Sequence, residues 1–475
     1  MDLSNLTIKK ASELLQSKKL TVKELVDFYL GRIEKTKDLN IFLETYSDLD
    51  KQIIEAQDKI DNGSATVLTG IPIAIKDNIL IKGKKASGAS KILEDYTATY
   101  DATVISKLKE QSPIFLGRVN MDEFAMGGST ENSAYGVTKN PVDNTRVPGG
   151  SSGGSAASIS ADLAVVSLGS DTGGSIRQPA GFCGVVGLKP TYGSVSRYGL
   201  MAMASSLDVI GPLSKNVEDA EIIFNAIKGK DIKDSTTVEK NPKDDVENVD
   251  GNTVKKIGVP RNFLKKGIDS DVLENFEKSL KKLSENGYEV VDIEMPDLKY
   301  SLSVYYVIMP AEVSSNMARY DGVKYGKKIE GDDLIGDYFK TRGNLIGKEV
   351  RRRIILGTYS LSAGYSDQYY NKAWQVRNLI KHEFENAFKE VDLVAMPTSP
   401  TPAFKIGEKS KDPVSMYLSD IFTVSSNLAG VPAISIPDGT VSREEKKLPT
   451  SLQLIASRLC EEKLFEVGKK FETIE

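Results

Sequence analysis

The sequence contains very little histidine and cysteine, and this scarcity excludes several kinds of site. The single histidine among 475 residues is His382, within the polar segment 381–384 and far from any glycine-rich segment. A Ser-His-Asp triad would have to use it, and a histidine-rich metal site is excluded, so we expect a solvated surface side chain. The two cysteines, Cys183 and Cys460, lack partners at metal spacing, which excludes a disulfide framework and a cysteine-type zinc site.

Other absences concern nucleotides and membranes. No Gly-Lys pair precedes Ser or Thr, so a phosphate-binding P-loop is excluded. No apolar run approaches the roughly 18 residues that span a bilayer, and residues 1–4 do not begin a signal peptide. The net charge of −4 argues against strong nucleic-acid binding by this chain, although residues 351–353 form a local basic patch. We therefore expect a soluble, cytoplasmic protein without membrane contact.

The pattern of apolar residues predicts an α/β fold with a mixed central sheet covered by helices on both faces. Apolar residues at 40% and charged residues at 27% are typical of a soluble globular chain. Short apolar runs alternate with glycine-rich turns between residues 69 and 205, which is typical of an α/β sheet. We expect strands at 71–76, 113–116, 164–168, 256–260, 288–293 and 391–396. Helices are expected at 21–33, 49–60, 101–109, 155–161, 271–285 and 360–389.

We interpret residues 1–475 as a single domain, although length alone would suggest roughly three. Its parts are an N-terminal helical region (about 1–65), a glycine-rich core (about 66–215), a charged surface loop (about 230–256) and a C-terminal half (about 257–475). The loop is predicted because aspartate, glutamate and lysine crowd a stretch with almost no apolar content.

Ser175 is the first candidate for chemistry, at the end of Asp-Thr-Gly-Gly-Ser, residues 171–175. Glycines lack a Cβ, so consecutive backbone N–H groups can turn toward one point beside the serine hydroxyl. Such donors stabilise an oxyanion by on the order of 3 kcal/mol each. The alternative is a glycine-rich turn that only joins a strand to a helix.

Two further residues complete the candidate set. Ser151 lies in Gly-Gly-Ser-Ser-Gly-Gly-Ser, residues 149–155, where it would exchange a proton with Ser175; the alternative is a flexible linker. Lys76 ends the apolar run 71–76. Burial would lower its pKa from ~10.4 by roughly three units and make it a general base. The alternative for Lys76 is a strand end that reaches solvent.

Lys76, Ser151 and Ser175 together resemble the amidase signature family, whose hallmark is a Ser-cisSer-Lys triad. Residues 149–179 carry the similarity, with Asp-x-Gly-Gly-Ser-Ile-Arg-x-Pro at 171–179. The resemblance implies the amidase signature fold, with Ser175 as nucleophile and Ser151 bridging it to the base Lys76. It also implies an oxyanion hole made of the backbone N–H groups of Thr172, Gly173, Gly174 and Ser175.

Residues 120–131, 184–212 and 427–432 are similar to one branch of that family, the A subunits of tRNA-dependent amidotransferases. The resemblance covers essentially the whole chain. It implies an enzyme that hydrolyses glutamine and supplies ammonia for converting Glu-tRNA(Gln) to Gln-tRNA(Gln). It further implies a heterotrimer with B and C subunits, in which the B subunit binds tRNA, ATP and Mg while this chain holds no cofactor or metal.

Glutamine carries an α-ammonium and an α-carboxylate, which suit a buried carboxylate and a guanidinium fork respectively. For this pocket the resemblance implies Ser129, Tyr305, Arg353 and Asp420. The sequence does not separate Tyr305 from Tyr306, or Arg353 from Arg352. Asp171 and Arg177 are expected to pair and brace the oxyanion loop.

Two other functions stay open at this point. A stand-alone amidase acting on simple or aryl amides would share Lys76, Ser151 and Ser175 but would not need the Arg/Asp pair. A catalytically silent scaffold subunit would need none of the three.

Overall fold

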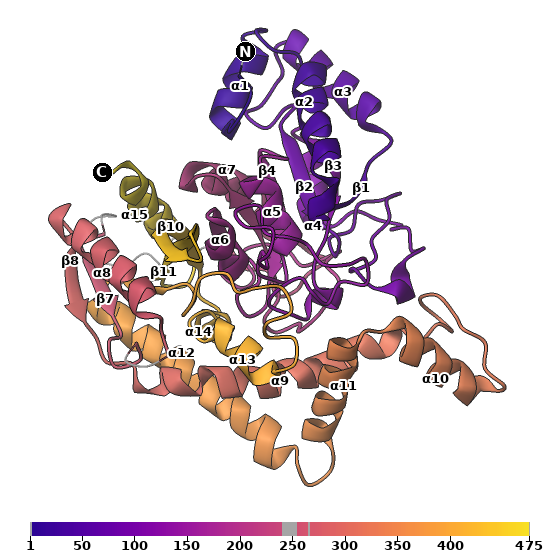
Figure 1. Ribbon diagram of the computed structural model, residues 1–475, viewed down its shortest axis with the longest axis vertical. Helices are drawn as coiled ribbons and strands as arrows, with labels where there is room; N and C mark the ends of the chain where they lie inside the picture. Colours follow the sequence, from indigo (N-terminus) through magenta and orange to yellow (C-terminus); the bar gives the residue numbers. More distant parts are fainter. Residues whose placement is uncertain (1, 240–253, 265–266, 475) are drawn as a thin grey trace.

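The computed structural model describes residues 2–239, 254–264 and 267–474, and its eleven strands form one mixed sheet (Figure 1). The order across the sheet is β1 (Phe42–Thr45), β3 (Ile114–Val119), β2 (Pro72–Lys76), β4 (Val166–Asp171), β6 (Val209–Ser214), β5 (Val186–Lys189), β10 (Ala433–Arg443), β11 (Lys446–Ala456), β9 (Leu393–Pro397), β7 (Lys256–Val259) and β8 (Glu289–Asp292). Strands β3, β2 and β4 run parallel, as do β9, β7 and β8, and the other neighbours are antiparallel. The predicted α/β class is confirmed.

The helices surround this sheet. In the described ranges they are α1 (Ile8–Gln16), α2 (Val22–Lys35), α3 (Leu49–Asp61), α4 (Thr103–Lys109), α5 (Gly153–Ser160), α6 (Arg177–Cys183), α7 (Val217–Ile227), α8 (Ser270–Glu285), α9 (Ser301–Asn316), α10 (Leu334–Leu345), α11 (Lys348–Leu361), α12 (Lys372–Glu390), α13 (Pro413–Tyr417), α14 (Val424–Ala429) and α15 (Glu461–Thr473). Figure 1 shows α9, α11 and α12 as a helical layer beside the sheet, with α10 projecting outward.

Two neighbouring residues of β10 show that helices cover both faces of the sheet. A methyl group on Gly181 of α6 would approach Ser435, whereas one on Gly468 of α15 would approach Ile436. Adjacent side chains of a strand point to opposite faces, so α6 and α15 lie on opposite sides.

The helix predicted near the N-terminus is present and begins at its capping box. Thr21 Oγ1 accepts a hydrogen bond from the Glu24 N–H at 3.2 Å, and the Glu24 carboxylate accepts one from the Thr21 N–H at 2.9 Å. This capping box satisfies two N–H groups that lack partners within the helix, and α2 begins there. Leu25, Tyr29 and Ile33 then lie buried at helical spacing.

Two expectations need correction or restriction. The predicted helix 360–389 is in fact two helices, because α11 ends at Leu361 and a turn and a π-helical segment (Asp367–Asn371) precede α12. Of the predicted loop 230–256, residues 240–253 lie outside the described residues. The part before them is held by partly buried contacts, since Asp231 accepts hydrogen bonds from Thr103 and Ser196.

No helix in the described part of the chain is long and apolar enough to cross a membrane. His382 is exposed on α12, where it contacts Glu385, as the sequence predicts.

Candidate active site

The ammonium nitrogen of Lys76 lies at the carboxyl end of β2, in the interior of the protein. Strand β2 is buried along its whole length between β3 and β4, and Lys76 has no exposed surface. Its Nζ lies 2.8 Å from Ser151 Oγ, 2.7 Å from Ser152 Oγ and 2.9 Å from Ser170 Oγ. The structure therefore joins Lys76 to Ser151, and the solvent-reaching alternative for this lysine is wrong.

Burial is also the main influence on the charge of Lys76. It lowers the pKa of the ammonium from 10.5 to about 7, although the carboxylates of Asp122, Asp171 and Asp208 act in the opposite direction. Removal from water disfavours the charged form because a low-dielectric interior solvates it poorly. A large share of Lys76 is consequently neutral near pH 7, which a general base requires.

Ser151 follows a glycine pair that is enclosed by neighbouring chain segments. The Gly150–Ser151 peptide bond is cis. A Cβ at Gly150 would lie 2.1 Å from the Asp122 carboxylate and 2.6 Å from the Ser129 backbone nitrogen, so only glycine fits there. Gln178 fixes the same segment by accepting from the Gly150 N–H at 3.0 Å. These contacts place the Ser151 hydroxyl beside Lys76.

The loop from Thr172 to Ser175 follows β4 directly. Within the described residues, the backbone N–H groups of Thr172, Gly173 and Ser175 have no acceptor. The Gly174 N–H differs from expectation, because it donates to Asp171 Oδ1 at 2.8 Å. Gly174 has φ +131°, a conformation that other residues rarely adopt. The expected set of four free donors is reduced to three.

Ser175 presents the most accessible hydroxyl of the candidate set. The residue is 8% exposed, whereas Lys76 and Ser151 are fully buried. Its Oγ makes no hydrogen bond to any described residue, and the link to the Ser151 segment is the Ser152 N–H, which donates to the Ser175 carbonyl at 3.1 Å. Ser175 is thus reachable by a substrate and adjacent to the Lys76–Ser151 pair.

The structure separates the two arginines that the sequence left ambiguous. The Arg353 side chain is 5% exposed and that of Arg352 is 44% exposed, because consecutive residues of α11 point in directions about 100° apart. The Arg353 guanidinium lies over the rings of Tyr306 and Tyr417, 5.8 Å from each centroid, and donates to Glu349 at 2.9 Å. Arg353 is therefore the arginine that faces the interior.

The other candidate pocket residues gather around the oxyanion loop. A Cβ at Gly173 would lie 2.5 Å from Tyr305 Cζ, so the Tyr305 ring rests on that loop. The Tyr306 hydroxyl donates to Asp420 at 3.3 Å. Burial raises the pKa of Asp420 to about 7, against the stabilising effect of the Arg353 guanidinium and the Tyr306 hydroxyl on the ionised form. Tyr305 thus contacts the oxyanion loop, whereas Tyr306 contacts Asp420.

Ser129 is buried and lies beside the glycine pair. Its N–H donates to Asp122 at 3.3 Å, and its hydroxyl accepts from the Glu131 N–H at 3.4 Å. A Cβ on the neighbouring Gly128 would lie 3.9 Å from the Asp420 carboxylate. These contacts connect the segment that holds Ser151 to the segment that holds Asp420.

Sequence reasoning missed several residues that complete the site. Ser170 and Ser152 both contact Lys76 Nζ, and Asn78 Nδ2 donates to Ser170 Oγ at 2.9 Å. Ser152 adjoins Ser151, which is a usable signal. Ser170 is brought to Lys76 by the parallel pairing of β2 with β4, which no local pattern reveals.

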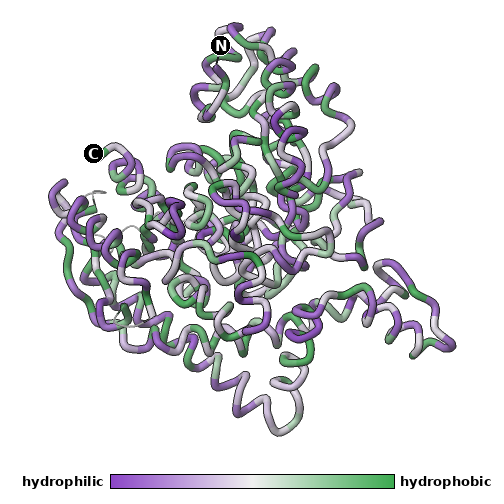
Figure 2. The backbone as a smooth tube through the Cα atoms, viewed as in Figure 1, coloured by the Kyte–Doolittle hydropathy of each residue, from purple (hydrophilic) through white to green (hydrophobic). Residues whose placement is uncertain are grey.

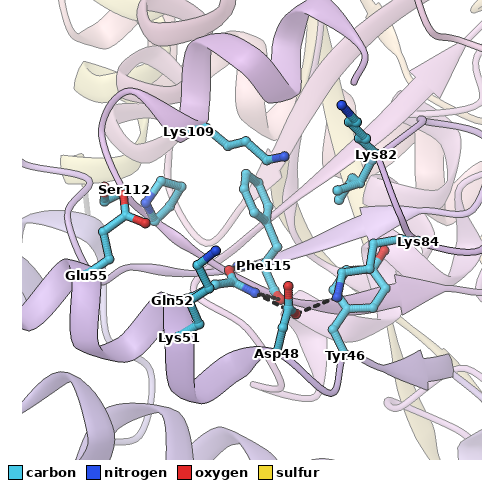
Figure 3. Close-up of a pocket in the computed structure, with 12 residues that line it drawn as sticks. Tyr46, Asp48, Lys51, Gln52, Glu55, Lys82, Lys84, Lys109, Ser112 and Phe115 are labelled. Atoms are coloured by element: carbon cyan, nitrogen blue, oxygen red, sulfur yellow. Dashed lines mark hydrogen bonds and ion pairs between the residues drawn. The ribbon is translucent and has the colours of Figure 1, made fainter. Parts of the chain in front are cut away.

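The surface pocket in Figure 3 is separate from this site. It encloses about 280 Å³ and contains none of the candidate catalytic residues. Two of the four lysines that line it form ion pairs, Lys84 with Asp48 and Lys109 with Asp101. Across the described residues, no group of three or more histidine, cysteine, aspartate or glutamate side chains is arranged to hold a metal ion.

Comparison with known proteins places this geometry in context. The amidase family model matches residues 24–465. The chain is 52% identical to the A subunit of the glutamyl-tRNA(Gln) amidotransferase from Thermoanaerobacter pseudethanolicus, over 99% of this chain and 97% of that one. The A subunit from Thermodesulfovibrio yellowstonii is 50% identical, over 99% and 98%. The crystal structure of the A subunit from Thermotoga maritima is 43% identical with a TM-score of 0.79, covering 99% of this chain and 94% of that one.

Proposed function

The chain belongs to the amidase family, and from that membership we propose that it is the glutamine-hydrolysing subunit of a tRNA-dependent amidotransferase. Such an enzyme converts Glu-tRNA(Gln) to Gln-tRNA(Gln), with glutamine as the amide donor. The observation that carries the proposal is the fully buried Lys76, whose pKa is about 7 and whose Nζ lies 2.8 Å from Ser151 Oγ. Neutral lysine in this position takes the place of the histidine that serine hydrolases commonly use.

The reaction has two stages. In the first, Ser175 Oγ attacks the side-chain amide carbon of glutamine while its proton passes through Ser151 to neutral Lys76. The N–H groups of Thr172, Gly173 and Ser175 stabilise the tetrahedral oxyanion. The carbon–nitrogen bond then breaks, ammonia leaves with the proton that returns through Ser151, and a glutamyl ester remains. In the second stage water cleaves the ester, releasing glutamate and free Ser175.

Opposite charges beside the oxyanion loop support glutamine as the substrate. Arg353 is assigned to the α-carboxylate and Asp420 to the α-ammonium, while Tyr305, Tyr306 and Ser129 shape the pocket between them. Thr423 Oγ1 donates to the Gly173 carbonyl at 2.6 Å and lies 3.1 Å from the Asp420 carbonyl. The ammonium ligand is thereby connected to the loop that would hold the oxyanion.

The partners proposed for this chain are the B and C subunits of the amidotransferase. Relatives that match nearly the whole chain are themselves named as A subunits of such an enzyme. The surface supports a subunit role, because the projecting helix α10 and the helix that follows it, α11, carry hydrophobic stretches (Figure 2). Their exposed apolar side chains include Ile335, Phe339 and Ile355. We assign this apolar face to a partner subunit, and we assign tRNA, ATP and Mg to the B subunit.

The test is covalent labelling with an electrophilic glutamine analogue beside a simple-amide analogue of matched reactivity. Mass spectrometry of the full chain, with and without co-expressed partner subunits, would locate the adduct. A glutamine-selective adduct on Ser175 supports the proposal. Equal labelling by both reagents would indicate a general amidase, and an adduct on another residue would refute the nucleophile.

A further inference from the structure

The loop that follows β4 contains three free N–H groups, and its first residue is held by a carboxylate that the sequence did not point to. Thr172 Oγ1 donates to Asp208 Oδ1 at 2.7 Å, and both residues are buried. The antiparallel pairing of β4 with β6 sets Asp171 opposite Val209, so the next pair along the ladder brings Thr172 to Asp208.

Asp208 is itself fixed by the backbone of the preceding loop. The Met203 N–H donates to Asp208 Oδ2 at 2.9 Å, and the Ala204 N–H lies 3.2 and 3.1 Å from the two carboxylate oxygens. Asn316 of α9 anchors the same loop through the Met203 carbonyl and the Ser205 hydroxyl, each at 3.1 Å. A carboxylate held by fixed donors is a rigid acceptor, so Thr172 has little freedom to rotate.

We propose that Asp208 is a positioning residue for the amide hydrolysis: through the Thr172 hydroxyl it orients the N–H groups of Thr172 and Gly173 toward the oxyanion. The inference rests on the proposed nucleophilic role of Ser175, and it holds for any amide substrate. Donors aimed before the reaction begins stabilise developing charge without reorganisation.

The charged and titratable groups around Asp208 determine how its ionisation depends on pH. Burial raises its pKa to about 6, while the Thr172 hydroxyl, the N–H groups of the loop and the Arg197 guanidinium favour the carboxylate. From the other elements packed here, Lys76, Tyr192 and Tyr305 face the same charge. At neutral pH Asp208 is ionised, which raises the pKa of Lys76 relative to the value that burial alone would give.

Rates of Ser175 labelling by a fluorophosphonate test the proposal without requiring glutamine. Ser175 Oγ bonds to phosphorus, the phosphorus–fluorine bond breaks, fluoride leaves and the hydroxyl proton passes to Lys76. The phosphoryl oxygen, which gains negative charge in the pentacoordinate transition state, occupies the place of the carbonyl oxyanion. The full chain with its co-expressed partners would be labelled across a range of reagent concentrations and pH, and the adduct mapped by mass spectrometry.

Thr172→Val should lower the maximal labelling rate by about 10- to 100-fold with little change in the half-saturating concentration, because the donors lose their alignment. Thr172→Ser keeps the hydroxyl and should restore a rate close to that of the unaltered chain. Thr138→Val is the matched control, since it removes a buried hydroxyl that donates to the Asn40 carbonyl at 2.9 Å, away from the site.

Asp208→Asn separates an electrostatic role from a merely structural one, because a structural role would not change the pH dependence of labelling. It should slow labelling and shift the acid limb of the rate profile to lower pH, because the charge that favours the Lys76 ammonium is gone. An unchanged rate in Thr172→Val, or equal losses in the valine and serine variants, would overturn the proposal. Labelling that behaves as described while glutamine is not hydrolysed would count against the proposed substrate alone.

Discussion

Arg177 and Asp171 form a completely buried ion pair directly beside the oxyanion loop. Two guanidinium nitrogens donate to the carboxylate at 3.1 Å each, and the remaining donors reach the Thr423 carbonyl and the side chains of Ser426, Gln453 and Asn427. Burial opposes ionisation, but the Arg177 guanidinium outweighs it and holds the pKa of Asp171 well below its usual range. The pair thus ties the loop after β4 to α14 and β11.

Removing the cation of this pair should destabilise the fold. Arg177→Met leaves the Asp171 carboxylate buried without a counter-charge, which costs about 3–5 kcal/mol of unfolding free energy. Denaturant unfolding monitored by circular dichroism measures the loss. Lys23→Met is the control, because it breaks the exposed pair with Asp27 and should cost at most about 1 kcal/mol. Equal stabilities of the two variants would contradict the bracing role.

Removing the proposed base should abolish most glutamine hydrolysis. Lys76→Ala is expected to lower kcat by about 10²- to 10⁴-fold, because Ser151 then has no base to which it can pass the Ser175 proton. Ammonia release in a coupled assay measures the rate. Lys82→Ala alters an exposed lysine in the pocket of Figure 3 and should leave it unchanged. Near-normal hydrolysis by Lys76→Ala would remove the base assignment.

The rate should fall as pH decreases through about 7. Lys76 works only as the neutral amine and Asp420 binds an ammonium only as the carboxylate, and burial places the pKa of each at about 7. Both active forms gain population as pH rises, so log kcat/KM should climb with a slope approaching two on the acid side and then level off. Asp420→Asn should reduce that slope to one. A rate that increases toward acid pH would exclude this pair of assignments.

Arg353 should determine the preference for an amino-acid substrate. Arg353→Ala is expected to raise KM for glutamine by about 10- to 100-fold, since a charge-assisted hydrogen bond to the α-carboxylate is lost. Hydrolysis of a simple amide without a carboxylate should change little. Arg352→Ala, on the exposed side of α11, is the matched control. The same loss for both amides would place Arg353 in the structural support of the site instead.

The apolar face of α10 and α11 should be needed for assembly. Ile335 and Phe339 are 64% and 76% exposed, and burying such side chains contributes about 1.5–3 kcal/mol each, so Phe339→Asp should weaken partner binding by at least about tenfold. Co-purification of the B and C subunits, followed by titration, measures the change. Ile232→Asp introduces the same charge at a fully exposed residue elsewhere and should have no effect. Undiminished assembly of Phe339→Asp would move the interface to another surface.

Local sequence determined much of the secondary structure and the chemical type of the site. The capping box of Thr21 and Glu24 determines where α2 begins, because the groups that bond lie three residues apart. The continuous apolar run before Lys76 required a strand buried on both faces, and burial in turn lowered the lysine pKa as predicted. Glycine is needed at residue 150 because the Asp122 carboxylate lies too close for a Cβ, and at residue 174 because φ is positive there. Each requirement belongs to a single residue.

Only the tertiary structure decided which side chains surround that chemistry. Asp208 meets Thr172 across 36 residues because β6 pairs with β4, and Asp420 meets Tyr306 across 114 residues because their helical segments pack together. Arg352 and Arg353 are adjacent in sequence, yet the helical turn of about 100° between neighbours buries one and exposes the other. Contacts of this kind depend on how whole elements pack, and a local pattern of residues carries no record of them.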